Sequence, residues 1–588
     1  MVKINNTNDK DKSLFTRVLD FLLKHKNELL SKDTNTKLPF SIGVDKYINA
    51  STNGYYVDKT LLIKDVLDTN TSVFLFTRPR RFGKSLNMDM LKIFFEKTKK
   101  DTSIYFKDKK IWACGKKYQE HQGKYPVIYL TFKDIKFSTW ESVYKNIITL
   151  IQAEFTRHSY LLDSSKLNKD DKNIFIKYKS TKLLSDESFN SLAVLSELLF
   201  KYHNKKTIII IDEYDIPIIQ GYIHGFYDEA IMFMRNFYSN GLKGNDWLKQ
   251  SFVTGILRVA KESIFSGFNN PEINTILDKR YSQYFGFTSD EVKEMLKYYE
   301  AEDKYQEICE WYDGYRFGNT EIFNPWSVIY YLNTNKADAY WCNTSSNDII
   351  GKLLKLVNEQ IYEKLHNLLQ GKTVKMYLNP NIVFPELERN VSSLFNLLLY
   401  TGYLKVINNE DLCSSGNLYD VAIPNKEIMY AYNNEIITKL NDGMTIELIL
   451  NLKDMIEEGD TDKLKNSLEE FLRKSASFHD SNESFYQGVL LTLCVIAFEN
   501  YEITSNRESG LGRYDIAMIP KKKSLPGIII EVKNQNNTSE NNLEDIATKA
   551  LEQIEEKQYD TVMKQRDVMQ VYKYGIAFSG KNVAIKKL

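Results

Sequence analysis

The stretch from residue 73 to residue 95 restricts the fold of this chain more than any other part of the sequence. It begins with an apolar run, Val73–Phe76, which predicts a buried strand, and from Ser85 onward an amphipathic pattern predicts a helix. A short basic loop between them ends in Gly83, Lys84 and Ser85. A loop in this position can bind a nucleotide phosphate, because backbone N–H groups and the helix N-terminus face the anion.

Two side chains of this loop have predicted roles in nucleotide binding. Lys84 supplies a positive charge for the phosphates, and the Ser85 hydroxyl is a candidate ligand of Mg²⁺. The phosphate-loop pattern Gly-x-x-x-x-Gly-Lys-Ser/Thr has glycine at its first position, where this chain has Arg78. Only half of the glycine signature is present, so the loop alone does not decide the function.

An isoleucine-rich run supplies the second half of a nucleotide site. Residues 206–212 contain four consecutive isoleucines, which predict a central parallel strand buried on both faces. Asp212 and Glu213 follow at its carboxyl end, where open α/β sheets place their active sites. We expect Asp212 to hold Mg²⁺ through water and Glu213 to activate the attacking water. Both could instead be solvated acids at a strand end, but the two halves in this order favour nucleotide binding.

Two further strands are predicted, at residues 125–131 and 250–254. Thr254 stands at the tip of the later strand, where a polar residue could sense the γ-phosphate. Arg258 follows it and could offset the charge that develops during phosphoryl transfer. Ordinary packing at a strand end, or a surface charge, is the alternative for these two residues.

The segment before the loop, residues 45–67, has two interpretations. Its position suits a wall for the adenine or ribose of a nucleotide. Its sequence equally suits the start of a short amphipathic helix, with Asp58 or Thr60 as the cap. The sequence leaves both open.

Length and composition limit the class of protein. With 588 residues the chain is too long for one hydrophobic core, so several domains are expected. A net charge of +1 gives no general electrostatic argument for binding nucleic acid. The five cysteines form no Cys-x-x-Cys pair, which argues against a zinc site and for a reducing, cytoplasmic location. The most apolar run, residues 488–498, is too short to span a membrane, which takes about 20 residues.

The region from residue 287 to about residue 450 has helical periodicity and is expected to be a lid or connecting domain. Residues 288–291, Thr-Ser-Asp-Glu, form a capping-box pattern at the start of one helix. Residues 311–318 and 324–331 are rich in aromatic side chains and predict a turn followed by a new helix. We interpret these aromatic residues as packing rather than chemistry.

Two predicted helices near the C-terminus carry polar residues in apolar surroundings. Residues 483–498 predict a buried helix with Glu483 and Gln487 on one face, since residues four apart are neighbours on a helix. Residues 542–556 predict a second helix, which contains Gln553. A hairpin is expected between the two helices.

The hairpin brings three charged residues together. Asp515 stands at the end of one apolar strand, and Glu531 and Lys533 lie on the other. Glu531 and Lys533 point to the same side, because side chains on a strand repeat every two residues. Asp515 and Glu531, with a strand carbonyl, would hold Mg²⁺ or Mn²⁺ with open water positions, and Lys533 would stabilise or orient the attacking hydroxide. A solvated strand face is the alternative interpretation.

Other polar residues are candidates for supporting roles. Glu483 and Gln553 would assist as additional ligands or orienting groups around the metal. Residues 521–523, three lysines at the hairpin tip, could contact phosphates together with Arg507 and Arg513. A solvated turn explains such a charge run equally well.

Residues from about 38 to 270 resemble the AAA-ATPase-like family of bacterial and fungal proteins. The resemblance rests on Tyr56-Val-Asp-Lys-Thr60, Arg78-Pro-Arg-Arg-Phe-Gly-Lys-Ser85, Ile211-Asp-Glu-Tyr-Asp215 and Thr254-Gly-Ile-Leu-Arg258. The arginine-rich loop is the usual form in that family, so Arg78 departs from the general phosphate-loop pattern only. The resemblance implies that the nucleotide is bound by Arg78, Arg80, Arg81, Phe82, Gly83, Lys84, Ser85, Asp212, Thr254 and Arg258.

Residues from about 483 to the end resemble the PD-(D/E)XK nuclease superfamily, in a branch commonly fused to such ATPases. Asp515, Glu531 and Lys533 match its core, and Gln553 matches its helix motif. Tyr514 takes the place of the proline, a common departure that leaves the metal site intact. The resemblance implies metal-dependent cleavage of nucleic acid, with DNA as the expected substrate.

The expected fold class is α/β, with three domains after a polar helical extension over residues 1–37. They are a P-loop NTPase domain with a mostly parallel sheet (38–287), a helical lid or connecting domain (288–455) and a restriction-endonuclease-like PD-(D/E)XK domain (456–588). The expected function is an ATP-driven, Mg²⁺-dependent nuclease with ATP and nucleic acid as partners and no membrane.

Two alternatives stay open. In the first, the protein is a nucleotide-dependent switch or scaffold, in defence against mobile elements, whose nuclease-like domain binds without cutting. In the second, the middle region is a protein-interaction module and the ATPase domain is merely structural. The intact Asp212 and Glu213 argue against the second alternative.

Overall fold

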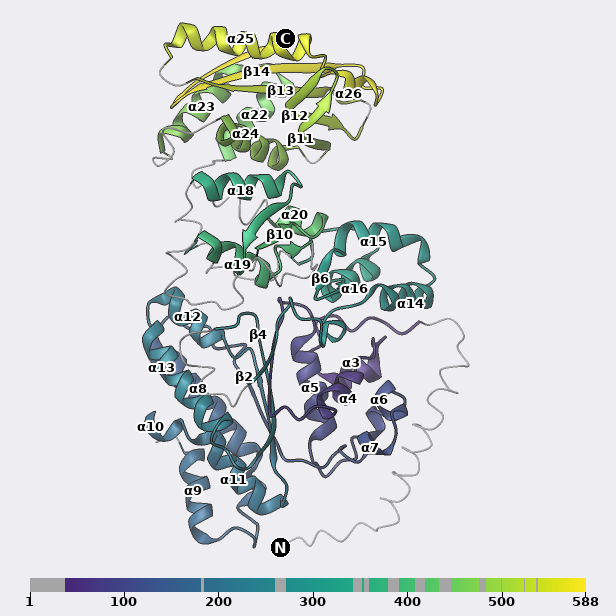
Figure 1. Ribbon diagram of the computed structural model, residues 1–588, viewed down its shortest axis with the longest axis vertical. Coiled ribbons are helices and arrows are strands. Elements are labelled where there is room, and N and C mark those ends of the chain that lie inside the picture. Colours follow the sequence, from purple (N-terminus) through teal and green to yellow (C-terminus); the bar gives the residue numbers. More distant parts are fainter. Residues whose placement is uncertain are drawn as a thin grey trace, which may run out of the picture.

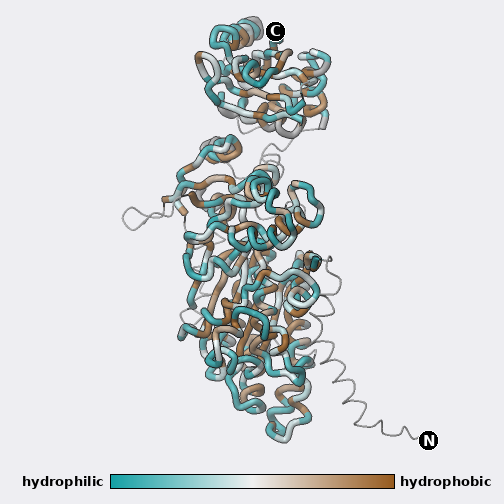
Figure 2. The backbone as a smooth tube through the Cα atoms, turned by 90° about the vertical axis from the view of Figure 1, so that its right-hand side faces the viewer, coloured by the Kyte–Doolittle hydropathy of each residue, from teal (hydrophilic) through white to brown (hydrophobic). Residues whose placement is uncertain are grey.

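The computed structural model describes residues 37–180, 185–259, 271–341, 350, 352–353, 359–378, 391–407, 418–432, 446–474, 483–498, 500–522, 524–535 and 538–588. The extension predicted over residues 1–37 lies outside them, apart from Lys37. Figure 1 shows three tiers along the long axis: a layered α/β tier, a mostly helical middle tier and a second sheet with helices at the C-terminal end. In Figure 2 the hydrophobic stretches of the first tier gather in its interior.

The first tier is built on a parallel sheet of five strands in the order β2-β3-β4-β1-β5. The strands are β1 (Val73–Thr77), β2 (Val127–Thr131), β3 (Thr207–Asp212), β4 (Leu248–Gly255) and β5 (Glu272–Asn274). Every residue of β1 and β3 is buried, as expected for strands covered on both faces. The four strands predicted from apolar runs are confirmed. β5 has only three residues with polar ends and leaves no such signal.

Helices cover both faces of this sheet (Figure 1). On one side lie α3 (Tyr47–Asn53), α4 (Leu61–Leu67), α5 (Lys84–Phe95), α6 (Lys110–Ala113) and α7 (Lys116–Gln119). On the other side lie α8 (Trp140–Arg157), α9 (Lys169–Lys179), α10 (Ser185–Ser188), α11 (Ser191–His203), α12 (Ile216–His224) and α13 (Tyr227–Leu242).

The register of the strands brings the carboxyl ends of β1, β3 and β4 to one edge of the sheet. Thr77 at the end of β1 pairs with Gly255 at the end of β4. On the other side of β4, Ile211 of β3 pairs with Val253. Because all three strands are parallel, the loop after β1 and the polar residues that end β3 and β4 meet at the same edge.

The middle tier is mostly helical, as predicted, but it also contains short strands. Its helices are α14 (Ser289–Tyr299), α15 (Tyr305–Tyr312), α16 (Pro325–Thr334), α18 (Glu359–Leu369), α19 (Val391–Thr401) and α20 (Lys426–Tyr432). Its strands are β6 (Tyr315–Phe317), β7 (Thr320–Ile322), β8 (Val374–Tyr377), β9 (Lys405–Val406) and β10 (Leu418–Ala422). The capping box at the start of α14 is confirmed. The β6–β7 hairpin follows Gly314 and turns at Gly318, whose φ angles are 91° and 54°.

The C-terminal tier is a mixed sheet in the order β11-β12-β13-β14-β15, in which only β13 and β14 pair in parallel. The strands are β11 (Tyr501–Ser509), β12 (Gly512–Pro520), β13 (Gly527–Asn534), β14 (Val571–Ser579) and β15 (Asn582–Lys587). The helices are α22 (Ile446–Glu457), α23 (Thr461–Lys474), α24 (Glu483–Ala497), α25 (Glu540–Glu556) and α26 (Thr561–Lys564). In Figure 1, α22 to α24 lie on one face and α25 lies on the other.

The predicted order of helix, hairpin and helix is confirmed by α24, β12–β13 and α25. One detail of the prediction is wrong: β12 extends back to Gly512, so Asp515 lies inside this strand rather than at its end. α24 contains the apolar run from residue 488 to residue 497 and ends one residue before Phe498. No helix within the described ranges is both long and apolar enough to cross a membrane.

Candidate functional site

The phosphate loop occupies residues 78–83, between β1 and α5. Two of its residues have a left-handed backbone conformation. Arg81 has a φ of 70°, and Gly83, the residue before α5, has a φ of 78°. A Cβ on Gly83 would have no heavy atom within 4 Å, so glycine is needed here for its backbone angle rather than for space. Arg81 adopts the same kind of angle at a cost of roughly 1–2 kcal/mol. Its guanidinium lies 3.9 Å from the ring centroid of Trp326 in α16.

Arg78, at the first glycine position of the pattern, lies inside the protein with no exposed surface. Its Nη1 donates to the carbonyls of Thr77 and Asn274, both at 2.8 Å, and its guanidinium lies over the rings of Phe285 and Phe317. Burial lowers the pKa of Arg78 to about 9. Among the described residues, its Nε and Nη2 have no hydrogen-bond partner. The side chain therefore ties the loop to β5.

A buried carboxylate joins the loop to the sheet. Asp212, at the end of β3, is 1% exposed. Its Oδ2 accepts a hydrogen bond from Ser85 Oγ at 2.7 Å, and its Oδ1 accepts one from Thr254 Oγ1 at 2.5 Å. Lys84 donates to two carbonyls of its own loop, at 3.0 and 2.8 Å, and burial lowers the pKa of its ammonium group. Ser85, Asp212 and Thr254 thus converge, as the sequence predicts, whereas Lys84 is turned toward the loop.

Two more acids follow Asp212. Glu213 has a left-handed backbone, with φ 55°, and burial raises the pKa of its carboxyl. Asp215 is fully buried, and its Oδ2 accepts hydrogen bonds from the N–H groups of Ile256 at 2.9 Å and Leu257 at 2.8 Å. Asp215 therefore holds the segment after β4 that leads to Arg258, which is partly exposed.

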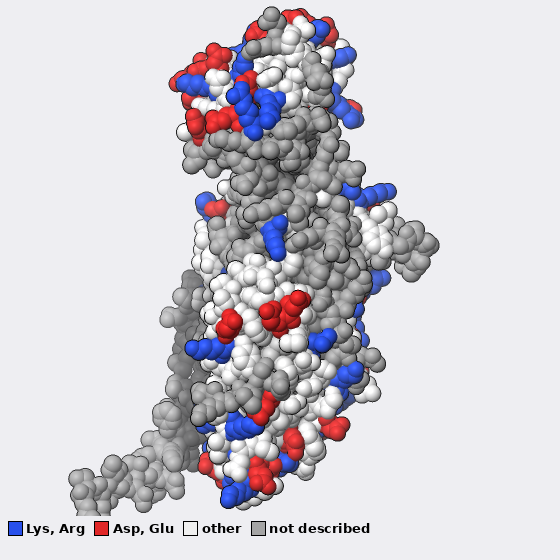
Figure 3. Space-filling model, turned by 90° about the vertical axis from the view of Figure 1, so that its left-hand side faces the viewer, with Lys and Arg blue, Asp and Glu red and all other residues white. Residues whose placement is uncertain are grey.

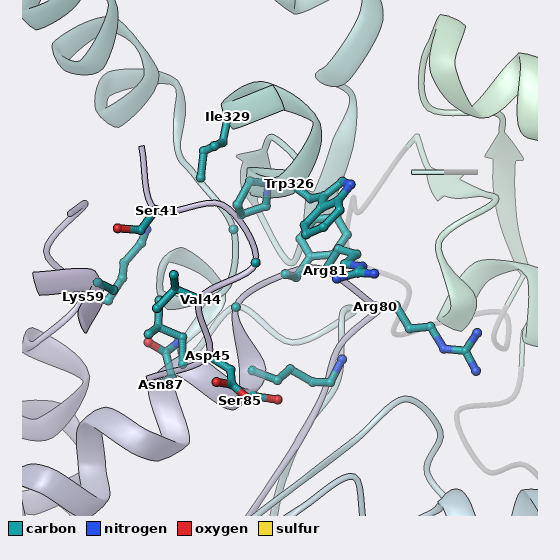
Figure 4. Close-up of a pocket in the computed structure, with 18 of the residues that line it drawn as sticks. Ser41, Val44, Asp45, Lys59, Arg80, Arg81, Ser85, Asn87, Trp326 and Ile329 are labelled. Carbon is teal, nitrogen blue, oxygen red and sulfur yellow. The ribbon is translucent and has the colours of Figure 1, made fainter. Parts of the chain in front are cut away.

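A cavity of about 440 Å³ opens at the phosphate loop. Glu213 lines it, together with residues 80–87 of the loop and α5. Three residues of α16 form another wall: Pro325, Trp326 and Ile329. In Figure 4 Arg81 lies against Trp326, whereas Arg80 points away from the other labelled side chains. The sequence predicts that the aromatic residues of α16 pack in a core, because no signal in the sequence separates packing from lining a cavity.

The segment at residues 45–67 has features of both interpretations. Tyr55, Tyr56 and Lys59 line the cavity, as do Ser41 and residues 43–45 nearby. Asp58 Oδ1 accepts a hydrogen bond from the N–H of Thr60 at 2.8 Å, just before helix α4 begins. Lys59 Nζ donates to both carboxylate oxygens of Glu291 at 2.7 and 2.6 Å. This ion pair connects the cavity wall to α14 in the middle tier.

The second cluster lies on β12 and β13. The ladder between these strands ends at the pair of Ile516 and Ile530, so Asp515 and Glu531 stand where the strands begin to separate. Glu531 is 1% exposed, and Lys533 Nζ lies 3.0 Å from its Oε1. The predicted shared face of Glu531 and Lys533 is therefore observed. Gln553 of α25 donates to the same oxygen of Glu531.

α24 covers the other side of this cluster. Gln487 Nε2 donates to the backbone carbonyl of Asp515 at 3.1 Å, and Glu483 accepts a hydrogen bond from the N–H of Asn534 at 3.3 Å. Asp515 Oδ2 accepts a hydrogen bond from the N–H of Val532 at 2.7 Å. Glu483, Gln487, Asp515, Glu531, Lys533 and Gln553, the charged and amide residues predicted for this site, thus lie around the point where β12 and β13 separate.

The electrostatics of the cluster suit a divalent cation. Burial and the charge of Glu531 raise the pKa of Asp515 to about 8, and burial also raises the pKa of Glu531. Glu531 Oε2 is buried, and it has no hydrogen-bond partner within the described chain. The described residues contain no group of three or more His, Cys, Asp or Glu placed to hold a metal. An ion here would therefore have two protein carboxylates and several waters, which suits Mg²⁺.

The charged surface of the C-terminal tier carries both signs, as Figure 3 shows for one face. Arg513 pairs with Glu508 at 3.2 Å, and Arg566 pairs with Glu502 at 3.4 Å. Residues 521–522 at the hairpin tip are exposed, and Lys523 lies outside the described residues. The basic side chains named here therefore do not by themselves identify a path for nucleic acid.

The burial of Arg78 predicts a structural effect of its removal. We expect Arg78→Ala to lower the free energy of unfolding by about 2–4 kcal/mol, because it leaves a cavity and two carbonyls without their donor. Arg80→Ala, at a partly exposed loop position, is the matched control. It should change the free energy of unfolding by less than about 0.5 kcal/mol. Chemical denaturation measures both variants, and equal stability of the two would contradict the role of Arg78.

The raised pKa of Asp515 predicts a pH-dependent effect on stability. The folded state keeps a proton up to pH of about 8, whereas the unfolded chain loses it near the ordinary value of 3.8. The contribution of Asp515 to the free energy of unfolding therefore falls as pH rises from about 4 to about 8 and is constant above that. Asp515→Asn removes this loss, so its melting temperature should rise relative to wild type between about pH 5 and about pH 8. Thermal unfolding in EDTA measures this, with the exposed Asp545→Asn as control; a difference independent of pH would refute the assignment.

Comparisons with known proteins agree with this division of the chain. Residues 41–265 match a family model described as a predicted AAA-ATPase, and residues 481–588 match the PD-(D/E)XK nuclease superfamily. A relative from Azotobacter chroococcum mcd 1, described as an uncharacterized protein in the vnfD 5' region, is 24% identical over 323 residues. That match covers 54% of this chain and 56% of the relative, so the chain spans about half the length of that protein. The chain therefore joins a region that matches the predicted AAA-ATPase family model to a C-terminal region that matches the PD-(D/E)XK nuclease superfamily model.

Proposed function

We propose that this protein binds and hydrolyses ATP and that its nucleotide state controls a Mg²⁺-dependent nuclease domain that acts on DNA. The observation that carries the proposal is the presence of two assembled clusters in one chain. One joins Ser85, Asp212 and Thr254 at the phosphate loop. The other joins Glu531 and Lys533 beside Asp515. Each cluster has the residue types that its chemistry requires.

At the first cluster, each residue has a separate task. The backbone N–H groups at the start of α5 face the phosphates, and Lys84 exchanges its two loop carbonyls for phosphate oxygens. Ser85 and Asp212 would hold Mg²⁺, which neutralises charge on the phosphates when bound. Glu213, whose carboxyl pKa is raised by burial, accepts the proton of the attacking water. Thr254 senses the γ-phosphate.

The remaining loop residues divide by position. Arg80, Arg81 and Phe82 line the cavity with Gly83, so we assign them to the nucleotide site. Arg78 supports the loop from below, as its burial suggests, and Arg258 follows the segment held by Asp215.

The base of the nucleotide extends from the phosphate loop toward α16. Trp326 and Ile329 offer aromatic and aliphatic surface on that side of the cavity, and Tyr55 offers a ring on the opposite segment. An aromatic ring can stack on any nucleobase, so this wall favours binding of a nucleoside triphosphate over binding of a free phosphate chain.

At the second cluster, Asp515 and Glu531 would hold Mg²⁺ or Mn²⁺, which activates a water molecule as the nucleophile when bound. Lys533 stabilises the negative charge that develops on the scissile phosphate. Gln553 orients Glu531 through its hydrogen bond, and Glu483 supports the β13 end through the N–H of Asn534.

The domain division is part of the proposal. We assign residues 38–287 to the ATPase domain, 288–455 to the connecting domain and 456–588 to the nuclease-like domain. Helix α22 lies across the last boundary and packs in the C-terminal core through Leu448 and Leu452. The C-terminal core thus includes the last residues of the connecting domain.

The position of the base predicts a ligand-specific effect of one substitution. Trp326→Ala should weaken ATP binding by about 5- to 150-fold, because stacking on a base contributes about 1–3 kcal/mol. It should lower the affinity for inorganic tripolyphosphate much less, since that ligand has no base and is linked to Trp326 only through Arg81. Isothermal titration measures both ligands, and Trp326→Phe should restore most of the ATP affinity. Equal losses for ATP and tripolyphosphate would place the base elsewhere.

The nuclease proposal predicts loss of cleavage without loss of nucleotide binding. Lys533→Ala should reduce the Mg²⁺-dependent cleavage of DNA by about 10²-fold or more, because it removes a charge that acts only on the developing anion. Its ATP affinity should equal that of wild type. Lys549→Ala, at an exposed lysine of α25, is the matched control.

The same assay tests the alternative function. If wild type cleaves neither single- nor double-stranded DNA or RNA with Mg²⁺ or Mn²⁺, with and without ATP, the nuclease proposal fails. A switch or scaffold would then be supported if Lys84→Ala abolished both ATP binding and binding of a nucleic-acid partner.

A further inference from the structure

The wall of the nucleotide cavity is connected to the rest of the middle tier by a buried carboxyl group. Ser327 follows Trp326 on α16, and its Oγ lies 2.8 Å from both carboxylate oxygens of Glu427 on α20. Glu427 Oε1 also accepts a hydrogen bond from the N–H of Trp341 at 2.8 Å. Glu427 therefore holds α16 and the chain that follows it against α20.

Burying the carboxyl group of Glu427 costs free energy. Its side chain has no exposed surface, and burial raises its pKa to about 8. Burying an apolar residue at this position would cost less free energy than burying a carboxyl group. We therefore assign Glu427 to fixing the orientation of its neighbours rather than to stabilising the fold. Its two partners fix the orientation of α16 and hence of Trp326.

The other end of α20 makes a second buried polar contact. Tyr432, the last residue of the helix, has no exposed surface. Its hydroxyl donates to the carbonyl of Leu365 in α18 at 3.2 Å. Glu427 and Tyr432 thus connect α16 to α18 through one short helix.

α18 packs against α24, the helix that covers the nuclease-like cluster. Figure 1 shows α18 directly next to the C-terminal tier. Gln487 of α24 donates to the carbonyl of Asp515, and Glu483 begins the same helix. A displacement of α18 would therefore reach the residues around Asp515 through a single intervening helix.

We propose that Glu427 and Tyr432 are positioning residues that carry the nucleotide state from the cavity wall to α24 and the metal-binding carboxylates. This inference rests on the proposed function, and it adds the route by which the two sites communicate. ATP changes the contacts of Trp326, α16 moves with Ser327, and α20 transmits the movement to α18 and α24. The route consists of packed helices joined by buried hydrogen bonds, which have discrete arrangements.

Tyr432→Phe tests the route with the loss of one hydroxyl. The ratio of DNA cleavage rates with and without ATP should fall from its wild-type value toward one. ATP affinity and the cleavage rate without ATP should stay within about twofold of wild type, because coupling is a separate free energy from binding or catalysis. Tyr47→Phe is the matched control, because Tyr47 also donates to a backbone carbonyl, that of Tyr105 at 2.9 Å, but lies off the route.

A second readout does not depend on cleavage. ATP should change hydrogen–deuterium exchange in residues 483–498 of wild type and of Tyr47→Phe, but not of Tyr432→Phe. Ser327→Ala, at the other end of the route, should give the same result as Tyr432→Phe.

The outcomes separate the route from the proposed function. Normal ATP effects on cleavage and exchange in both route variants would overturn the route and leave the proposed function intact. No effect of ATP on cleavage or exchange in wild type would overturn the coupling in the proposed function, and the route with it.

Discussion

The arrangement of the first tier depends on one buried carboxylate. Asp212 is 1% exposed at the end of β3, and an ionised group there costs several kcal/mol unless hydrogen bonds satisfy it. Ser85 and Thr254 supply those bonds, at 2.7 and 2.5 Å. Ser85 can do so only if α5 begins directly beyond the phosphate loop, and Thr254 only if β4 lies next to β3. Burial of Asp212 therefore fixes a loop, a helix and two strands relative to one another.

Hydrogen bonds satisfy the buried carboxylates of the C-terminal tier less completely than they satisfy Asp212. Glu531 is equally buried, but only its Oε1 is bonded, by Lys533 and Gln553. Its Oε2 has no partner within the described residues, and Asp515 next to it has its pKa raised to about 8. Such a pair of acids is unfavourable when both are ionised and no cation is present. A divalent cation would relieve this repulsion and satisfy the remaining oxygen, which is a physical reason to retain both acids.

Much of this architecture follows from the sequence, because it depends on simple periodicities. Continuous isoleucines predict β3, and the two-residue repeat predicts that Glu531 and Lys533 share a face. The residues that the sequence does not reveal depend on tertiary contacts. Arg78 is a charge in a basic loop, and only the fold shows that it lies under that loop against Phe285 and Phe317. The sequence around Trp326 is the same whether this side chain packs in a core or lines a cavity. Strand β5 is too short to show any periodicity in the sequence.

Under the proposed function, Trp326 would determine which tiers of the molecule a bound nucleotide contacts. A ligand shifts a conformational equilibrium only by the difference in its interactions with the two states. A phosphate chain bound to the loop alone would contact the first tier directly and would reach the middle tier only through loop side chains such as Arg81, which lies against Trp326. A base that reaches α16 would contact both tiers, and Lys59 already pairs with Glu291 across the same junction. The cavity wall on α16 is therefore the feature through which a nucleotide can change how the first two tiers meet.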